Sequence, residues 1–176
     1  MSEPRDEVDV IPVGAAQWPL IEGLFQFYVY DFSEMEPVQS AEFDVDPRGR
    51  FGDYPYIDSD WSEPARIPLV IRWRGRPAGF ALLNDHSHSG LTADHNMAEF
   101  FVMRKYRRQG VASAAVRQIL VRYPGLWEAA VAARNTAARA FWPRAVTATP
   151  GVRDLTILEG DGVRWTGPIL RFTVDP

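Results

Sequence analysis

The sequence predicts a mixed α/β fold of the α+β type, in which a central, mostly antiparallel sheet of about seven strands is flanked by about four helices. Short apolar runs typical of strands are interrupted by stretches with apolar residues at helical spacing, and Gly, Pro and Asn separate them. The 176 residues, 46% of them apolar, are enough for one domain with its own core. We therefore expect residues 1–176 to form a single domain.

The first half of the chain predicts one strand, one helix and a hairpin. Residues 8–13 alternate in polarity as a strand does, and residues 17–30 carry apolar side chains at helical spacing. Residues 37–64 are rich in Pro, Gly, Asp and Ser, which favours an irregular connection with one short helix. Residues 67–73 and 77–83 have the composition of two strands joined by a tight turn.

The second half predicts strands that alternate with helices. The expected elements are a polar loop at 84–96, a strand at 97–103, a helix at 107–121, a strand at 126–132, a helix from 135 onward, and a hairpin of 155–158 with 165–174. Asn135 is a typical helix cap, and Pro143 should kink or end the helix that it starts.

The passage from strand to helix at residues 98–112 carries the chemistry. Backbone N–H groups are free at the start of a helix and the helix dipole is positive there, so this end binds phosphate. Gly110 lets the backbone approach a pyrophosphate, Ala112 keeps the first turn slim, and Arg107 and Arg108 add positive charge. The spacing alone also fits an ordinary turn with solvated arginines, and neither a P-loop nor the three-glycine dinucleotide pattern occurs.

Composition argues against several classes of protein. Cysteine is absent, so disulfides, Cys-bound metals and thiolate nucleophiles cannot occur, and the net charge of −4 argues against a nucleic-acid partner. The acidic start is unlike a secretion signal, and no apolar run reaches the roughly 20 residues that cross a bilayer. We therefore expect a cytoplasmic protein without a membrane partner. His86 and His88 with Asp85 are too few for a zinc site, so we expect no metal.

Two motifs resemble those of the GNAT N-acetyltransferase superfamily. One is its acyl-CoA pyrophosphate motif (Arg or Gln, two residues, Gly, one residue, Gly or Ala), and the other is its second CoA-side motif (Asn, two residues, Ala, then aromatics). The matching residues are Arg107, Arg108, Gln109, Gly110, Val111 and Ala112 in the first, and Asn135, Ala138, Phe141 and Trp142 in the second. Tyr30-Asp31-Phe32-Ser33 and Glu99-Phe100-Phe101-Val102 are similar to a poorly characterised bacterial branch of predicted acetyltransferases.

The resemblance implies an acetyl-CoA cleft where the sheet splays apart, between the strand of Phe101 and that of Val131. The acyl-pantetheine arm would pair with backbone groups of Phe101, Val102 and Met103, and both motifs would contact the cofactor. Direct attack of an amine on the thioester, without an acyl-enzyme, is also implied, and the absence of cysteine agrees with it. Homodimers are common among similar proteins, although no residue here marks an interface.

The resemblance also assigns catalytic positions. Glu99 interrupts an apolar strand where related enzymes often place a general base, although a Glu on the solvent side of the strand is the alternative. Trp142 stands where many relatives have a Tyr that protonates the leaving thiolate. An indole cannot donate a proton at neutral pH, but a thiol with a pKa of about 8.5 can leave as the thiolate. Tyr106 and Tyr123 could replace this acid by residue type only.

The acceptor site is implied to lie over the N-terminal helix and the loop that follows it. Tyr28, Asp31 and Glu34 there would suit a cationic amine, through cation–π contact and charge pairing. The alternative for the aromatic rings of this helix is that they pack into the core.

These observations together predict an acyl-CoA-dependent N-acetyltransferase that acetylates a primary amine of a small molecule or a peptide. A catalytically weak or inactive acyl-CoA sensor of the same fold is the alternative, favoured by Trp142 and Pro143. A transferase that uses an aminoacyl-tRNA is a third hypothesis, against which the acidic chain argues.

Overall fold

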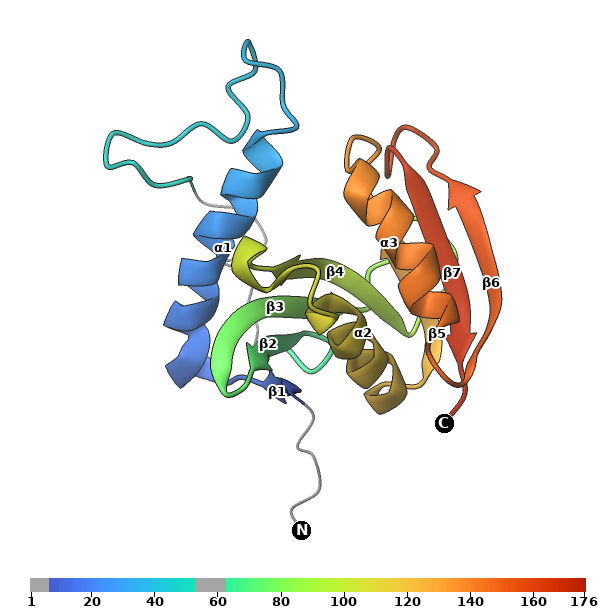
Figure 1. Ribbon diagram of the computed structural model, residues 1–176. Coiled ribbons are helices and arrows are strands. Elements are labelled where there is room, and N and C mark those ends of the chain that lie inside the picture. Colours follow the sequence, from blue (N-terminus) through green and yellow to red (C-terminus); the bar gives the residue numbers. More distant parts are fainter. Residues whose placement is uncertain (1–6, 53–62) are drawn as a thin grey trace.

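The computed structural model describes residues 7–52 and 63–176. Within these ranges, seven strands form one sheet in the order β1-β2-β3-β4-β5-β7-β6 (Figure 1), and all neighbouring pairs except β4 with β5 are antiparallel. The strands are β1 Val8–Pro12, β2 Ile67–Trp73, β3 Arg76–Asn84, β4 His95–Val102, β5 Gly125–Ala130, β6 Val152–Glu159 and β7 Pro168–Val174. The helices are α1 Trp18–Ser33, α2 Val111–Arg122 and α3 Thr136–Thr147, with 3-10 turns η1 Ala15–Gln17 and η2 Arg104–Tyr106.

The helices lie on both faces of the sheet because successive side chains of a strand point to opposite sides. Val70 on β2 and Phe80 on β3 pack with the buried side chains of α1. Their neighbours Leu69 and Ala81 belong to the larger core cluster, which includes residues of α2 and α3. The helix α1 therefore covers one face, and α2 and α3 cover the other (Figure 1). No helix in the described ranges combines the length and apolarity needed to cross a bilayer.

The expected strands and the mixed sheet are confirmed, and two expectations need correction. The described part of the chain has three α-helices. The short helix expected within residues 37–64 is absent from residues 37–52, and residues 53–62 lie outside the description. The helix α2 begins at Val111, four residues later than expected, because Arg107 is extended and both Arg108 and Gly110 have positive φ angles. Pro143 does not end α3, which continues to Thr147.

The continuation of α3 past Pro143 has a packing explanation. A proline inside a helix removes a backbone hydrogen bond and costs about 3 kcal/mol. Trp142, Ala145 and Val146 around it are buried against the sheet. Burying one large apolar side chain stabilises by about 1.5–3 kcal/mol, so these contacts outweigh the proline.

The sheet forks between β4 and β5. These parallel strands pair only at His95 with Trp127 and at Asn96 with Glu128. Two residues after Asn96, Ala98 has no partner on β3 because the register shifts there, which is a β-bulge. A bulge bends the strand that carries it, and β4 leaves β5 from this point. The predicted splay of the sheet is thereby confirmed (Figure 1).

Candidate active site

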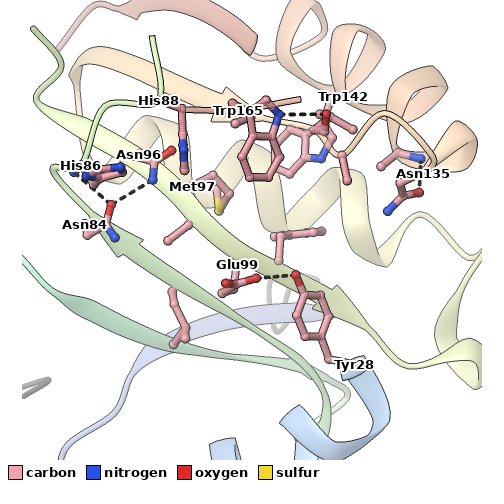
Figure 2. Close-up of a pocket in the computed structure, with 18 of the residues that line it drawn as sticks. Tyr28, Asn84, His86, His88, Asn96, Met97, Glu99, Asn135, Trp142 and Trp165 are labelled. Atoms are coloured by element: carbon pink, nitrogen blue, oxygen red, sulfur yellow. Dashed lines mark hydrogen bonds between the residues drawn. The ribbon is translucent and has the colours of Figure 1, made fainter. Parts of the chain in front are cut away.

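A cleft of about 430 Å³ opens in the fork between β4 and β5. Its walls come from α1, β4, α3, the ends of β3 and β5, the loop after β3 and the connection between β6 and β7. The residues that line it include Tyr28, Phe32, Arg66, Asn84, His86, His88, Asn96, Glu99, Phe100, Asn135, Ala138, Trp142, Arg164 and Trp165. Figure 2 shows how these side chains surround one space.

Glu99 turns its carboxylate into this cleft (Figure 2). Glu99 is only 9% exposed and accepts a hydrogen bond from the Tyr28 hydroxyl on α1. A buried charge is costly unless it has hydrogen-bond partners, so the phenol of Tyr28 helps to keep the carboxylate in place. This position rules out the alternative of a solvent-facing Glu; the role of general base stays a prediction.

The start of α2, the predicted phosphate site, is open. Gly110 is left-handed (φ 78°, ψ −5°), and no side chain caps the helix at this position. A Cβ on Gly110 would meet no atom within 4 Å, and residues 107–110 are exposed. Because the first N–H groups of a helix have no partner within it, they can bind an anion that approaches here.

Arg107 ties this loop to its neighbours. Its Nε donates to the Val102 carbonyl at 2.7 Å, and its guanidinium pairs with Asp31 and lies 5.7 Å from the centre of the Phe101 ring. Two of its nitrogens are therefore already occupied by the fold. Arg108 and Gln109, the next two residues of the predicted motif, are exposed at the rim of the loop.

The three predicted acceptor residues do not lie together. Tyr28 lines the cleft, but Asp31 and Glu34 do not. Asp31 pairs with Arg104 at 2.8 Å as well as with Arg107, and Glu34 pairs with Arg104 at 3.2 Å. The two carboxylates therefore join α1 to the basic loop.

Backbone groups along the end of β4 differ in the direction they face. The Met103 N–H donates to Ala78 on β3 at 2.8 Å. Because backbone groups alternate in direction along a strand, those of Val102 and Phe100 face the open side of the fork. Of the predicted residues Phe101, Val102 and Met103, none lines the cleft, and the Val102 carbonyl on the open side of the fork accepts the hydrogen bond from Arg107.

The start of α3 forms the opposite wall. The Asn135 Oδ1 accepts a hydrogen bond from the Ala138 N–H at 3.0 Å, so Asn135 caps the helix and also lines the cleft. Trp142 is buried with its indole edge-on to Phe100, at 5.3 Å between ring centres. Phe141 stacks on Phe100 and faces a second hollow between α2 and α3.

One end of the cleft is a polar wall that sequence analysis missed, formed by Asn84, His86, His88, Asn96 and Trp165 (Figure 2). The Asn84 Oδ1 accepts from the Asn96 Nδ2 at 2.9 Å and from the His86 N–H at 3.1 Å. The His88 ring lies between those of His86 and Trp165, at 4.8 and 4.7 Å. Asn96 gave no such signal as Glu99 did, because it fell in the expected loop, whereas β4 begins at His95.

A buried ion pair holds this wall. Glu128 on β5 is fully buried, pairs with Arg171 on β7, and accepts hydrogen bonds from Ser87, Ser89 and the His88 N–H. Burial by itself raises the pKa of Glu128, but the hydrogen bonds from the loop outweigh it and the pKa is lowered. The loop is thus fastened to the sheet through a charged carboxylate.

The charged and imidazole groups do not assemble into a metal site in the part of the chain that the structure describes. No three His, Asp or Glu side chains there are grouped closely enough to hold a metal ion.

Comparison with known proteins places the chain among acetyltransferases. The model of the acetyltransferase (GNAT) family matches residues 30–146. Similar solved structures include an acetyltransferase from Thermus thermophilus, with 16% identity, a TM-score of 0.61 and 96% of both chains covered. RimJ from Mycobacterium smegmatis in complex with CoA-disulfide has 21% identity and a TM-score of 0.59, over 95% of this chain and 81% of that one.

A third structure is that of spermidine N-acetyltransferase from Vibrio cholerae in complex with CoA and spermine. It has 10% identity and a TM-score of 0.53, over 96% of this chain and 95% of that one. At such identities these structures establish the fold alone. No curated protein matches the chain.

Proposed function

The chain belongs to the acetyltransferase (GNAT) family, and on this premise we propose that it transfers the acetyl group of acetyl-CoA to a primary amine of a small molecule or a peptide. The observation that carries the proposal is that β4 holds Glu99 in the cleft and leads, through the loop at Gly110, into the open start of α2. The exposed loop at Gly110 is tied to Val102 at the end of β4, and the same strand presents Glu99 in the cleft. A thioester bound along β4 would lie beside a buried carboxylate.

The hollow between α2 and α3, of about 500 Å³, supports binding of the nucleotide end of acetyl-CoA. Ser113, Arg117 and Arg144 line it, close to the start of α2. Guanidinium groups form strong hydrogen bonds with phosphate, and CoA carries phosphates at this end of the molecule. The nucleotide would rest here, its pyrophosphate on the N–H groups after Gly110, and the pantetheine arm would enter the fork.

Acetyl-CoA supplies the activated acyl group as a thioester. An amine attacks as the free base, so its ammonium form must first lose a proton. The ammonium proton passes to solvent. We assign Glu99 to take, directly or through a water, the second N–H proton, which the nitrogen loses as the new C–N bond forms and the C–S bond breaks. The leaving group departs as a thiolate, because Trp142 has no proton to give at neutral pH. No acyl-enzyme is needed.

The same indole favours a second candidate function, an acyl-CoA-binding module with little or no turnover. Trp142 is buried edge-on against Phe100, as a core side chain is. Such a module would bind acetyl-CoA without releasing its thiol.

Binding is tested first, by thermal unfolding with and without acetyl-CoA. A ligand at about 100 times its Kd stabilises the native state by about 2.7 kcal/mol, which raises the melting temperature. Gly110→Glu should abolish this rise, because it fills the phosphate site and adds a negative charge. Gly49→Glu is the matched control: Gly49 also has a positive φ and open space, but lies in the loop after α1. If acetyl-CoA raised the melting temperature of Gly110→Glu as much as that of the wild-type protein, the phosphate site at Gly110 would be refuted.

Turnover is tested next, by thiol release across a panel of amines. Glu99→Gln keeps the shape of the side chain and removes the base, so kcat should fall by about 10²–10⁴-fold. The melting-temperature rise with acetyl-CoA should remain. Binding without thiol release for any amine in the wild-type protein would favour the sensor instead.

A further inference from the structure

The polar wall of the cleft presents two buried polar atoms that have no partner in the described residues: the Asn96 Oδ1 and the His88 Nδ1. Both residues line the cleft. Buried polar groups in native proteins nearly always have a hydrogen-bond partner, so two such atoms on one wall point to a ligand that supplies the partners.

The orientation of the Asn96 amide is set by its neighbours. Asn96 is 1% exposed, and its Nδ2 donates to the Asn84 Oδ1. That Asn84 oxygen also accepts from the His86 N–H, so it cannot be an amide nitrogen. The Asn96 Nδ2 is therefore the atom toward Asn84, and its Oδ1 is left as a buried hydrogen-bond acceptor without a partner in the described residues.

The His88 Nδ1 is an acceptor as well. Burial, and then the neighbouring His86, lower the pKa of His88, although Glu128 and a hydrogen bond with the Arg164 backbone oppose this. The ring is therefore neutral at physiological pH and carries one proton. Because Nδ1 has no partner in the described residues while the ring contacts the Arg164 backbone, we place that proton on Nε2, which leaves Nδ1 with a free lone pair.

Hydrogen bonds and an ion pair hold the polar wall in place, so it can discriminate between substrates. The backbone N–H of His88 donates to Glu128 at 2.9 Å, and Glu128 pairs with Arg171 behind the loop. Arg171 also donates to the Thr92 carbonyl at 2.7 Å. The positively charged residues on the cleft rim are engaged with acids: Arg66 pairs with Glu63, and Arg164 with Asp161.

We infer that the Asn96 Oδ1 and the His88 Nδ1 form an acceptor pair that selects amine substrates carrying a second N–H or O–H donor. This inference rests on the proposed function and names its substrate class. The reacting amine would lie at Glu99, and its amide, hydroxyl or second amine tail would donate to the pair. A carboxylate tail would meet two acceptor lone pairs and be rejected, and a methyl tail would leave both atoms unpaired.

The test uses linear primary amines of graded chain length that end in an amide, a hydroxyl, a methyl or a carboxylate. At the best chain length, kcat/KM should be about tenfold higher for the amide and hydroxyl tails than for the methyl and carboxylate tails, which corresponds to one net hydrogen bond. Equal values for all four tails, or a preference for the carboxylate, would overturn the inference.

Paired variants separate recognition from packing. Asn96→Leu removes the free oxygen and should lose the preference for donor tails, whereas Asn96→Asp keeps an acceptor there and should retain it. Both break the bond to Asn84, so a structural role alone would affect them alike. Similarly, His88→Asn keeps an amide at the Nδ1 position and should retain the preference, and His88→Gln should lose it. The same preference in all four variants would contradict the inference.

The two proposals can fail separately. The stabilisation by acetyl-CoA is measured on every variant and should stay within twofold in Kd, because the polar wall lies away from the α2 start. A wild-type protein that binds acetyl-CoA and turns over amines without regard to their tails refutes the acceptor pair only. A protein that binds no acetyl-CoA refutes the proposed function, and the acceptor pair with it.

Discussion

The Tyr28 hydroxyl on α1 donates a hydrogen bond to the Glu99 carboxylate on β4, and so joins the first helix to the strand at the fork. The phenol ring is fixed by other aromatics, with ring centres 5.3 Å from Phe25, 5.7 Å from Phe80 and 5.9 Å from Phe101. The Tyr28 ring is therefore held by the core, and the residue lines the cleft. This arrangement makes it a positioning residue for Glu99.

Tyr28→Phe should reduce kcat by about tenfold with little change in the KM for acetyl-CoA. The ring and its packing stay, and one hydrogen bond to a charged group is lost, worth about 1.5–3 kcal/mol. Steady-state kinetics with the best amine checks this, and the melting temperature shows whether the fold is intact. An unchanged kcat would mean that the other contacts of Glu99 suffice to hold it.

Glu128→Ala should destabilise the protein by about 3–5 kcal/mol, because it leaves the Arg171 guanidinium without its buried partner. Urea unfolding measures the change. The control is Glu7→Ala, which breaks an exposed pair with Arg74 and should cost less than about 1 kcal/mol. Similar losses of unfolding free energy in the two variants would show that the buried pair contributes no more to stability than the exposed pair.

Stability should fall as the pH is lowered, in part through His88. The folded-state pKa of His88 lies below the ordinary 6.5, because of burial and His86, against Glu128 and the Arg164 backbone. The unfolded chain therefore binds the proton more tightly. The stabilisation is complete above pH 6.5 and is lost as the pH falls through the folded-state pKa. His88→Asn should show a smaller loss of unfolding free energy between about pH 7 and about pH 5; an identical loss would contradict the assignment.

Gly79→Ala should disrupt the junction of β3 with β4. A Cβ on Gly79 would lie 2.0 Å from the Phe101 carbonyl oxygen, which is backbone and cannot move aside alone. We expect a loss of more than about 2 kcal/mol, measured by urea unfolding. Gly23→Ala is the opposite case, since its Cβ meets nothing within 4 Å on α1, and it should stabilise by up to about 1 kcal/mol. An unchanged free energy of unfolding in Gly79→Ala would contradict this prediction.

Much of the fold was predictable because its strands are apolar runs and its turns carry Gly or Pro. Where prediction was wrong, tertiary packing or backbone geometry decided: burial of Trp142 and its neighbours carries α3 past Pro143, and the positive φ of Arg108 delays α2. Neither effect can be read from local periodicity. Resemblance, together with the helix-start argument, pointed to the loop at Gly110.

The cleft was only partly predictable. Glu99 was found because a charged residue in an apolar strand is conspicuous, and Asn96 was missed because the expected loop ran to residue 96 while β4 begins at His95. Glu128 and Arg171 are 43 residues apart, so their pairing depends on the adjacency of β5 and β7. Asp31 pairs with Arg104 and Arg107, and no single sequence reveals these ion pairs.

The fork has a mechanical consequence. In the sheet, the wing of β1 to β4 is joined to the wing of β5 to β7 by only two residue pairs, at His95 and Asn96. Glu99 belongs to the first wing, and Trp142 on α3 contacts Phe100 of that wing while sharing a core cluster with Leu170 of the second. A ligand bound between the two wings contacts both of them and should therefore reduce their motion relative to each other. We expect bound ligand to slow backbone amide hydrogen exchange even at residues that it does not contact.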